Sequence, residues 1–263
     1  MMKYLKINVI LFRNSLIRDL KINGYIISSV LFQVSDLFFS IVFFGVIFAN
    51  VKSLGDWNFY QVLFLFAFSK IIITVSTIWY RRGVQTIGRD LVRMGDLDFY
   101  LAKPVNPLIL VSISKPEIYE FINLFFSVPL VFYAAMKSGI AIGFTNLIWF
   151  IALFVCALLL YYFIQIITVV PAFWFIKLWS LTDILNRLSQ FMRYPVNIFP
   201  LYLKFLLMVL VPILTVSYVP VATLFYPPRT LYIIFMFAIT LVFGIIVSLV
   251  WKAGLKHYGS ASS

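Results

Sequence analysis

The sequence predicts an all-α integral membrane protein with six transmembrane helices. Of its 263 residues, 63% are hydrophobic and only 11% are charged, and the mean hydropathy is +1.03. Soluble domains contain about 45–50% apolar and about 25% charged residues, so this apolar excess has no soluble interior to enter. Runs of roughly 20 apolar residues recur, each long enough to cross about 30 Å of hydrocarbon. Disordered chains, secreted disulfide scaffolds and large soluble catalytic domains are therefore excluded.

The N-terminal residues 1–22 form the first element. Apolar and basic side chains alternate there at near-helical spacing, which is typical of an amphipathic helix lying among lipid headgroups. A plain cytosolic flank is the alternative. The segment lacks the short apolar core and cleavage site of a signal peptide.

Six segments are expected to span the bilayer. Five are clean apolar runs, whereas the fifth in chain order also contains Asp183, Arg187 and Arg193. The predicted spans are residues 24–50, 60–80, 117–136, 147–170, 178–199 and 230–251.

The charges orient these spans. Residues 81–115 form the only long polar stretch, and six predicted spans put this loop on the same side as both termini. That side then carries 14 lysines and arginines, and the opposite side carries four. Cytoplasmic loops carry such an excess of Lys and Arg, so the sequence predicts a multi-pass protein of the cytoplasmic membrane with both termini inside. The net charge of +12 is thereby explained without a nucleic-acid partner.

Prolines interrupt the segment before the last span. Residues 194–228 contain six of the eleven prolines yet remain apolar. Proline breaks the helical hydrogen-bond ladder, and broken helices at membrane depth occur where protein or a cavity surrounds them. We therefore expect residues 200–228 to form re-entrant helices on the outer side. A seventh span over residues 201–219 is the alternative, and it would place the basic tail outside.

Catalytic chemistry is poorly represented. The chain lacks the G-x-x-x-x-G-K-[ST] phosphate loop of nucleotide hydrolases, and its only histidine and cysteine are His257 and Cys156. Paired-histidine metal sites and a histidine-based nucleophile relay are therefore not expected. We expect no catalytic residue, no metal and no cofactor in this chain.

Charged residues inside the predicted spans are the candidate substrate-path residues. Asp36 and Lys70 lie mid-span in the first two helices, at depths that differ by about 9 Å if counted from the intervening turn at 1.5 Å per residue. Asp183 and Arg187 lie four residues apart, the favourable order for a helical ion pair. Intramembrane charges are costly and commonly functional. The alternatives are buried ion pairs or contacts with another subunit.

Residues 95–107 carry the most specific motif. They read Gly-Asp-Leu-Asp-Phe-Tyr-Leu-Ala-Lys-Pro-Val-Asn-Pro, which resembles the G-x-L-D-x-x-L-x-[KR]-P-x-N-P element of permease subunits in the ABC-2 class of ABC transporters. Weaker elements of that pattern follow in order. They are residues 172–174 (Ala-Phe-Trp), 193–195 (Arg-Tyr-Pro), 199–200 (Phe-Pro), the prolines 212 and 220, and the ending Trp251, Gly254 and Tyr258.

This resemblance implies the division of labour in the complex. An N-terminal connecting helix, six spans and outer re-entrant helices would accompany a cytosolic coupling helix within residues 86–101. A separate ABC ATPase subunit would bind ATP and Mg, and a second permease subunit, identical or similar, would complete the path. A solvated charged loop is the alternative for the coupling segment. The residues that would face the ATPase are Arg89, Asp90, Arg93, Asp96 and Asp98.

The sequence thus predicts the permease subunit of an ATP-driven exporter. The apolar, aromatic-rich spans favour an amphipathic substrate such as a lipid, peptide or drug. A membrane-embedded lipid-modifying enzyme or scaffold is the alternative, and it would act without an ATPase partner. A channel ranks third, because no span carries a continuous polar stripe.

Overall fold

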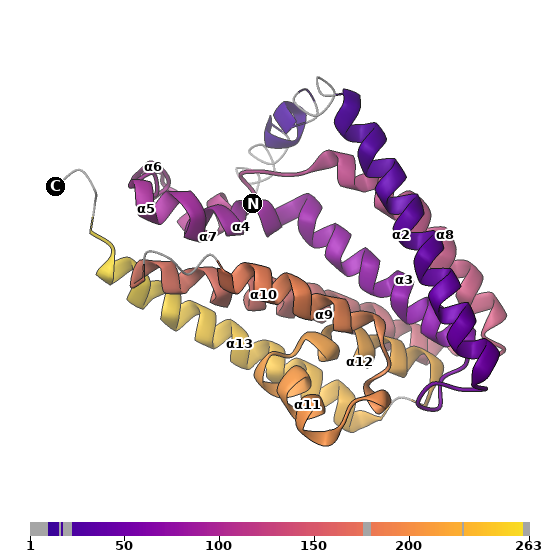
Figure 1. The fold of residues 1–263 in the computed structure, drawn as a ribbon. Coiled ribbons are helices and arrows are strands. Elements are labelled where there is room, and N and C mark those ends of the chain that lie inside the picture. The colour runs from indigo at the N-terminus through magenta and orange to yellow at the C-terminus, as the bar shows by residue number, and fades with distance from the viewer. Residues whose placement is uncertain (1–9, 16, 18–22, 176–179, 228, 260–263) are drawn as a thin grey trace.

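The structure is a computed structural model that describes residues 10–15, 17, 23–175, 180–227 and 229–259. Within these ranges all regular secondary structure is helical and no strand forms, which confirms the predicted all-α class. Five helices are long and apolar enough to cross a membrane. Figure 1 shows them inclined along a common direction, with the C-terminus and α5–α7 at one end of the bundle. The longer α-helices are α2 (Asn23–Asn50), α3 (Phe59–Ser76), α8 (Phe121–Lys137), α9 (Phe144–Val169), α12 (Ile213–Phe225) and α13 (Thr230–His257).

The second helix is longer than predicted. After α3 it continues without a break through two π-helical turns, η1 (Thr77–Arg81) and η2 (Ile87–Leu91), to Met94. At 1.5 Å per residue, its 36 residues extend about 54 Å, well beyond the hydrocarbon thickness. The predicted loop 81–115 therefore begins as a helix, which ends where Gly95 adopts a left-handed conformation (φ +80°).

Residues 82–112, which we call the elbow, fold back at this end of the bundle. They comprise α4 (Arg82–Thr86), η2, α5 (Val92–Met94), α6 (Asp98–Leu101) and α7 (Pro107–Ser112). The α7 segment crosses α4 so closely that a Cβ atom on Gly83 would lie 2.3 Å from the carbonyl oxygens of Val111 and Ser112. Glycine is therefore required at this crossing, because any larger residue would displace the backbone.

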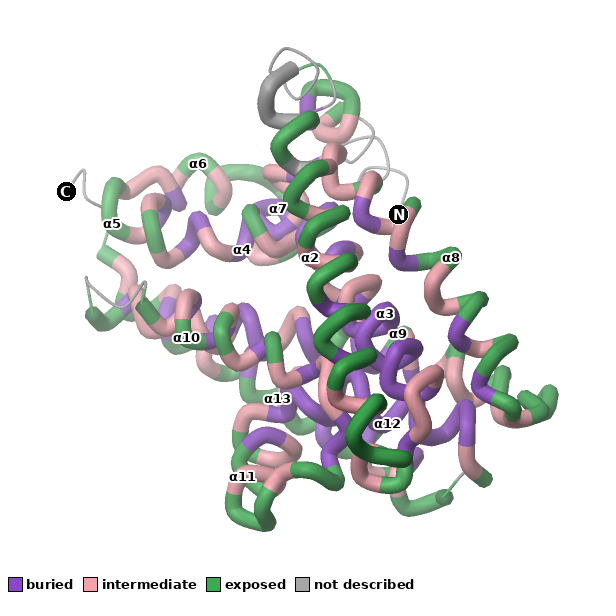
Figure 2. Tube along the Cα trace, turned by 45° about the vertical axis from the view of Figure 1, so that its right-hand side comes forward, coloured by how far each residue is buried: buried purple, intermediate pink, exposed green. Residues whose placement is uncertain are grey.

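The core is built on α3, α9 and α12. The α3 helix packs along α8, while α12 and α13 both pack along α9. All 13 residues of α12 are buried, and Figure 2 shows this buried helix within the bundle. A short polar helix, α10 (Ser180–Leu188), covers another side of α9.

The predicted fifth span is not a single long helix in the structure. In the described part of residues 178–199, α10 is followed by the 3₁₀ segments η5 (Ser189–Arg193) and η6 (Val196–Ile198). Helix α10 and η5 together extend about 24 Å, and this segment is not one of the five long apolar helices. Pro195 and Pro200 lack the N–H groups that would continue the helix.

The proline-rich segment is broken as predicted. Helices α11 (Leu201–Phe205) and η7 (Leu206–Leu210) meet α12 at an angle of 94°. The break falls at Val211 and Pro212, where the proline cannot donate a helical hydrogen bond. A continuous helix over residues 201–219 is therefore wrong, and the two arms together count as at most one broken span.

The first long helix is held only along one side. Helix α2 touches α3 and α8, and only 11% of its most apolar window is buried within the chain. Figure 2 shows most of it as exposed. Most of the amphipathic helix predicted over residues 1–22 lies outside the described residues. Residues 10–15 are helical, and the Ser15 hydroxyl donates a hydrogen bond to the Pro116 carbonyl oxygen.

Candidate functional site

The elbow has a hydrophobic core of its own. Val84, Ile87 and Leu97 are fully buried there against side chains of α9 and α13. Burial of apolar side chains fixes a segment to its support. The elbow is therefore attached to two long apolar helices rather than extending freely from the bundle.

Two of the weaker sequence motifs meet at this attachment. The Phe173 ring packs edge-on against Trp251 (centroids 5.5 Å apart) and Tyr258 (6.1 Å). A Cβ atom on Gly254 would lie 2.5 Å from the Phe173 ring, so glycine provides the space that this ring occupies. Residues 172–174 and 251–258 thus pack together as one aromatic joint. The order of these motifs in the sequence did not predict that they are in contact.

The motif at residues 95–107 shapes the tip of the elbow. Gly95 supplies the left-handed turn that ends α5, and the buried Leu97 anchors the turn that follows. The Asn106 side chain accepts hydrogen bonds from the Leu108 and Ile109 backbone N–H groups at 3.0 and 3.3 Å. Pro107 occupies the first turn of α7, where its missing N–H carries no cost.

The predicted coupling residues lie on and beside this tip. Arg93 is exposed, and Asp90, Asp96 and Asp98 are partly buried. Burial raises the pKa of Tyr258, and the nearby Asp98 and Asp96 carboxylates raise it further. The tyrosine is therefore a neutral phenol beside the acidic residues of the elbow.

Two exposed apolar side chains at the tip were missed by the sequence analysis. Met94 is 60% exposed and Phe99 is 71% exposed, although both lie among charged neighbours far along the chain from the long apolar runs. An exposed apolar centre with a polar rim is typical of a protein interface. Met94 lies three residues before the buried Leu97, and Phe99 lies two residues after it. This spacing was the signal in the sequence that would have marked both side chains as exposed.

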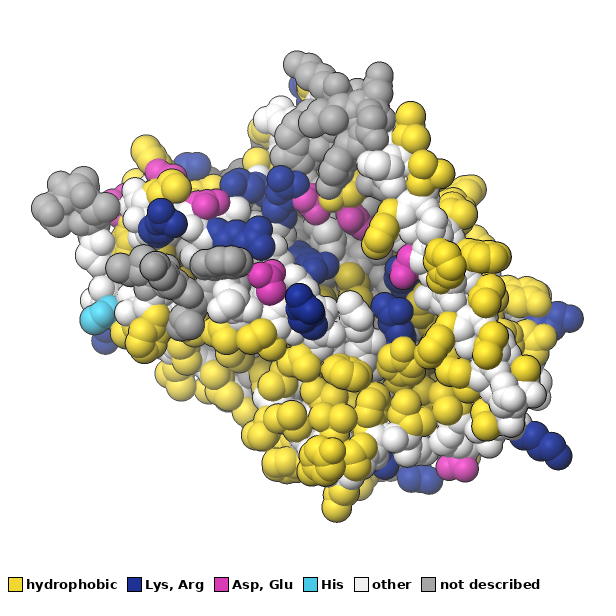
Figure 3. Space-filling model, viewed as in Figure 1, with side chains coloured by type: hydrophobic (Ala, Val, Ile, Leu, Met, Phe, Trp, Pro, Cys, Tyr) yellow, Lys and Arg dark blue, Asp and Glu magenta, His cyan; other side chains and the backbone are white. Residues whose placement is uncertain are grey.

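A cavity of about 330 Å³, which we call the charged cavity, opens beside the elbow. It lies where the α3 extension, the start of α8 and α10 meet, and Figure 3 shows charged side chains gathered in a hollow of this face above a broad hydrophobic area. Its lining residues are Thr77, Arg81, Arg82, Gln85, Arg89, Glu117, Glu120 and Asn186.

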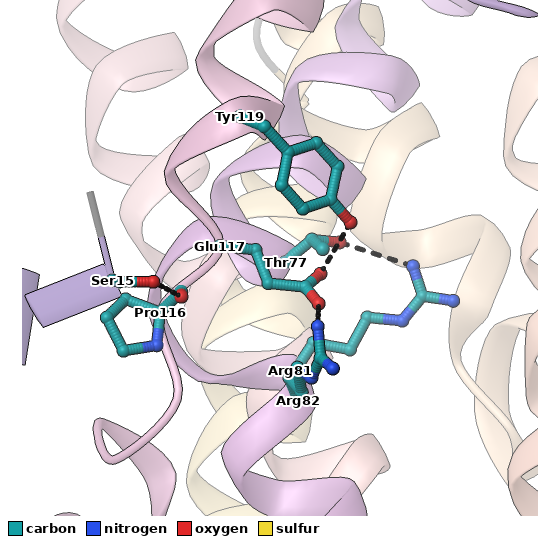
Figure 4. Close-up of polar contacts among 7 residues, drawn as sticks. All are labelled: Ser15, Thr77, Arg81, Arg82, Pro116, Glu117 and Tyr119. Atoms are coloured by element: carbon teal, nitrogen blue, oxygen red, sulfur yellow. Dashed lines mark hydrogen bonds and ion pairs between the residues drawn. The ribbon is translucent and has the colours of Figure 1, made fainter. Parts of the chain in front are cut away.

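Polar contacts hold the walls of the charged cavity together (Figure 4). Arg82 forms an ion pair with Glu117, which also accepts a hydrogen bond from the Tyr119 hydroxyl at 3.2 Å. Arg81 donates to Thr77 Oγ1 at 3.3 Å and to Asn186 Oδ1 at 2.7 Å. The α3 extension is thus tied to the segment that precedes α8 and to α10. Glu117 is the first residue of the predicted span 117–136, and the sequence analysis did not pair it with Arg82.

Glu117→Gln is expected to lower the free energy of unfolding by about 1–2 kcal/mol, because two donors lose a charged acceptor. Denaturant unfolding of the purified chain in detergent would measure it. Asp90→Asn is the matched control, since Asp90 is also a carboxylate near the cavity but makes no ion pair within the described residues. Equal losses in both variants would contradict a structural role for the Glu117 ion pair.

Asp36 and Lys70 form an ion pair between α2 and α3. Their side chains are 25% and 20% exposed, and the Lys70 ammonium also lies 5.9 Å from the centre of the Phe66 ring. The two residues therefore form the ion pair that the sequence analysis gave as an alternative. Their side chains bridge the expected 9 Å difference in depth. Because α2 has few other contacts, this ion pair is a main polar attachment between the two helices.

Asp183 pairs with a different residue from the one predicted. Its carboxylate lies 4.0 Å from Arg89 in η2, whereas the described structure shows no ion pair between Asp183 and Arg187. Two residues that the sequence analysis assigned to different roles, coupling and substrate path, are thus neighbours, and Arg89 also lines the charged cavity. Their shared position could not be read from the helical spacing alone.

Buried Gln165 in α9 is a further polar residue that sequence reasoning missed. Its side chain is 3% exposed, and neither amide atom has a hydrogen-bond partner within the described residues. The described residues contain no cluster of His, Cys, Asp or Glu that could hold a metal ion.

Comparison with known proteins gives one match. A family model described as an ABC-2 family transporter protein matches residues 34–262. That range includes the elbow, the charged cavity and the aromatic joint. No curated protein and no solved structure matches the chain.

Proposed function

This chain belongs to the ABC-2 family of transporter proteins, and from that premise we propose that it is the permease subunit of an ATP-driven exporter in the cytoplasmic membrane. The elbow end faces the cytoplasm, together with both termini. A separate ABC ATPase subunit binds and hydrolyses ATP with Mg. A second permease subunit, identical or similar, completes the transport path.

The exposed tip of the elbow is the observation that carries this proposal. Met94 and Phe99 are exposed apolar side chains at the tip, and Arg93, Asp96 and Asp98 lie beside them in the sequence. Interfaces concentrate binding energy in a few such central side chains. Because the elbow core is fixed to α9 and α13, a push on the tip is transmitted to the ends of two apolar helices.

The charged cavity is the cytoplasmic entrance for the substrate in this proposal. Its arginines and glutamates are tied to three separate elements, so movement of the elbow would alter its walls. Asp36 and Lys70 place a further polar contact deeper in an otherwise apolar helix pair. A substrate with a polar head and an apolar body fits these surroundings better than a fully hydrophilic solute.

The double variant Met94→Ala with Phe99→Ala tests the coupling surface. In the tagged chain, purified in mild detergent, we expect the affinity for the ATPase subunit to fall by about a hundredfold, because two central apolar anchors are removed. The variants Asp96→Ala and Asp98→Ala should weaken retention less, since charges at a rim contribute less than the centre.

Met136→Ala is the matched control, because Met136 is 85% exposed at the opposite end of the bundle. It should retain the ATPase fully. Wild-type chain that purifies with no ATPase activity would overturn the permease proposal. Retention of the ATPase by the double variant would place the coupling surface elsewhere.

A further inference from the structure

A second pocket lies at the end of the bundle opposite the elbow. It has a volume of about 310 Å³ and lies between the turn that joins α2 to α3, the end of α12 and the start of α13. We call it the turn pocket. The lining residues used below are Asp56, Trp57, Tyr218, Tyr226, Arg229 and Tyr232.

Aromatic rings form the walls of the turn pocket. Trp57, only 1% exposed, stacks on Tyr218 with centroids 5.4 Å apart and an interplanar angle of 29°. Tyr226 lies 6.0 Å from Trp57. The Tyr226 hydroxyl donates to the Asp56 backbone carbonyl oxygen at 3.1 Å and accepts from Gln61 at 3.3 Å. The walls are therefore fixed before any ligand arrives.

A tight turn holds Asp56 at the rim. Gly55 and Asp56 both have positive φ, +57° and +70°, and the flanking Leu54 and Trp57 exchange backbone hydrogen bonds of 2.9 and 3.2 Å. This is the conformation of a two-residue hairpin turn, in which aspartate tolerates the left-handed region. Asn197 secures the turn further by donating to the Gly55 carbonyl oxygen at 3.1 Å.

The rim carries two opposite charges that are kept apart. Asp56 and Arg229 are both exposed and line the same pocket, yet neither has an oppositely charged group within 4.0 Å among the described residues. The Arg229 guanidinium lies 5.8 Å from the centre of the Tyr232 ring. A cation and an anion are thus both available to a ligand across an aromatic floor.

We propose that the turn pocket binds a zwitterion that carries a phosphodiester and an ammonium group. The planar guanidinium of Arg229 matches a phosphate geometrically and can bind it with two hydrogen bonds. The Asp56 carboxylate and the tyrosine faces attract an ammonium group. This chemistry is that of a phosphatidylethanolamine headgroup or of the free headgroup. The site is distinct from the elbow and does not depend on the proposed coupling.

Native mass spectrometry of the full-length chain, with added dioleoyl phosphatidylethanolamine or dioleoyl phosphatidylglycerol, tests this proposal. The wild type should retain the zwitterionic lipid in preference to the anionic one. Arg229→Gln should weaken retention of the zwitterionic lipid by about tenfold, since a charge-assisted contact to phosphate is lost. Asp56→Asn should abolish the preference, because it removes the one carboxylate among the lining residues that attracts the ammonium group.

Lys52→Gln is the matched control, because Lys52 is an exposed charge on the same loop that does not line the pocket. It should behave as the wild type. Soluble glycerophosphoethanolamine distinguishes the sources: competition at low concentration assigns the free headgroup, and retention of the lipid despite it assigns the lipid. Wild-type retention of the zwitterionic lipid in Arg229→Gln, together with wild-type preference in Asp56→Asn, would overturn the proposal, whatever the outcome of the ATPase experiment.

Discussion

Gly83→Ala is expected to lower the free energy of unfolding by about 3 kcal/mol, at the upper end of the cost of overpacking. The new Cβ atom would lie 2.3 Å from two backbone carbonyl oxygens of α7. Backbone atoms cannot rotate away as a flexible side chain can, so α4 and α7 must separate. Separation exposes the buried elbow core around Val84 and Val111, and the coupling surface loses its support.

Equilibrium unfolding in mixed detergent micelles would measure this loss. Gly88→Ala is the matched control in the same helix, because its Cβ would lie 3.5 Å from Val169, an ordinary contact. Alanine also favours a helix over glycine by about 1 kcal/mol, so Gly88→Ala should be neutral or slightly stabilising. If both variants behaved alike, the α4–α7 crossing would not be as tight as the structure shows.

The sequence was sufficient for those parts of the fold that depend on local composition. Long apolar runs predicted α2, α8 and α9 to within a few residues, whereas α13 continues to His257, beyond the predicted end at residue 251. The prolines predicted a broken helix within residues 200–228. The charged residues of α10 were visible in the sequence, but the short length of this helix was not. A run that ends in 3₁₀ turns differs little in composition from a transmembrane span. The length of the second helix was also missed, since the polar residues after Tyr80 are compatible with both a helix and a loop.

The candidate site was only partly predictable, because its contacts join distant residues. The motif at residues 95–107 located the tip of the elbow, but the exposure of Phe99 depends on how Leu97 packs. Arg89 meets Asp183, and Arg82 meets Glu117, across helices whose rotation the sequence does not fix. Asp36 and Lys70 were singled out by the cost of intramembrane charge, and only the relative tilt of α2 and α3 brings them into contact.

Neutralising one member of the Asp36–Lys70 ion pair should destabilise the chain more than neutralising both. Asp36→Asn or Lys70→Gln leaves an unpaired charge whose side chain is mostly buried, at an expected cost of about 3 kcal/mol in the free energy of unfolding. The double variant removes both charges, so its free energy of unfolding should be within about 1 kcal/mol of the wild-type value. Unfolding of all four forms in the same micelles completes the double-mutant cycle.

Transport assays of the same four forms separate an ion pair that only holds α2 from one that also contacts substrate. If the pair acts only as an attachment, the double variant should recover transport together with stability. Recovery of stability without recovery of transport would assign Asp36 and Lys70 to the substrate path. If the single variants are as stable as the wild type, the ion pair does not hold α2 against α3, and the exposed face of α2 must be supported by another subunit instead.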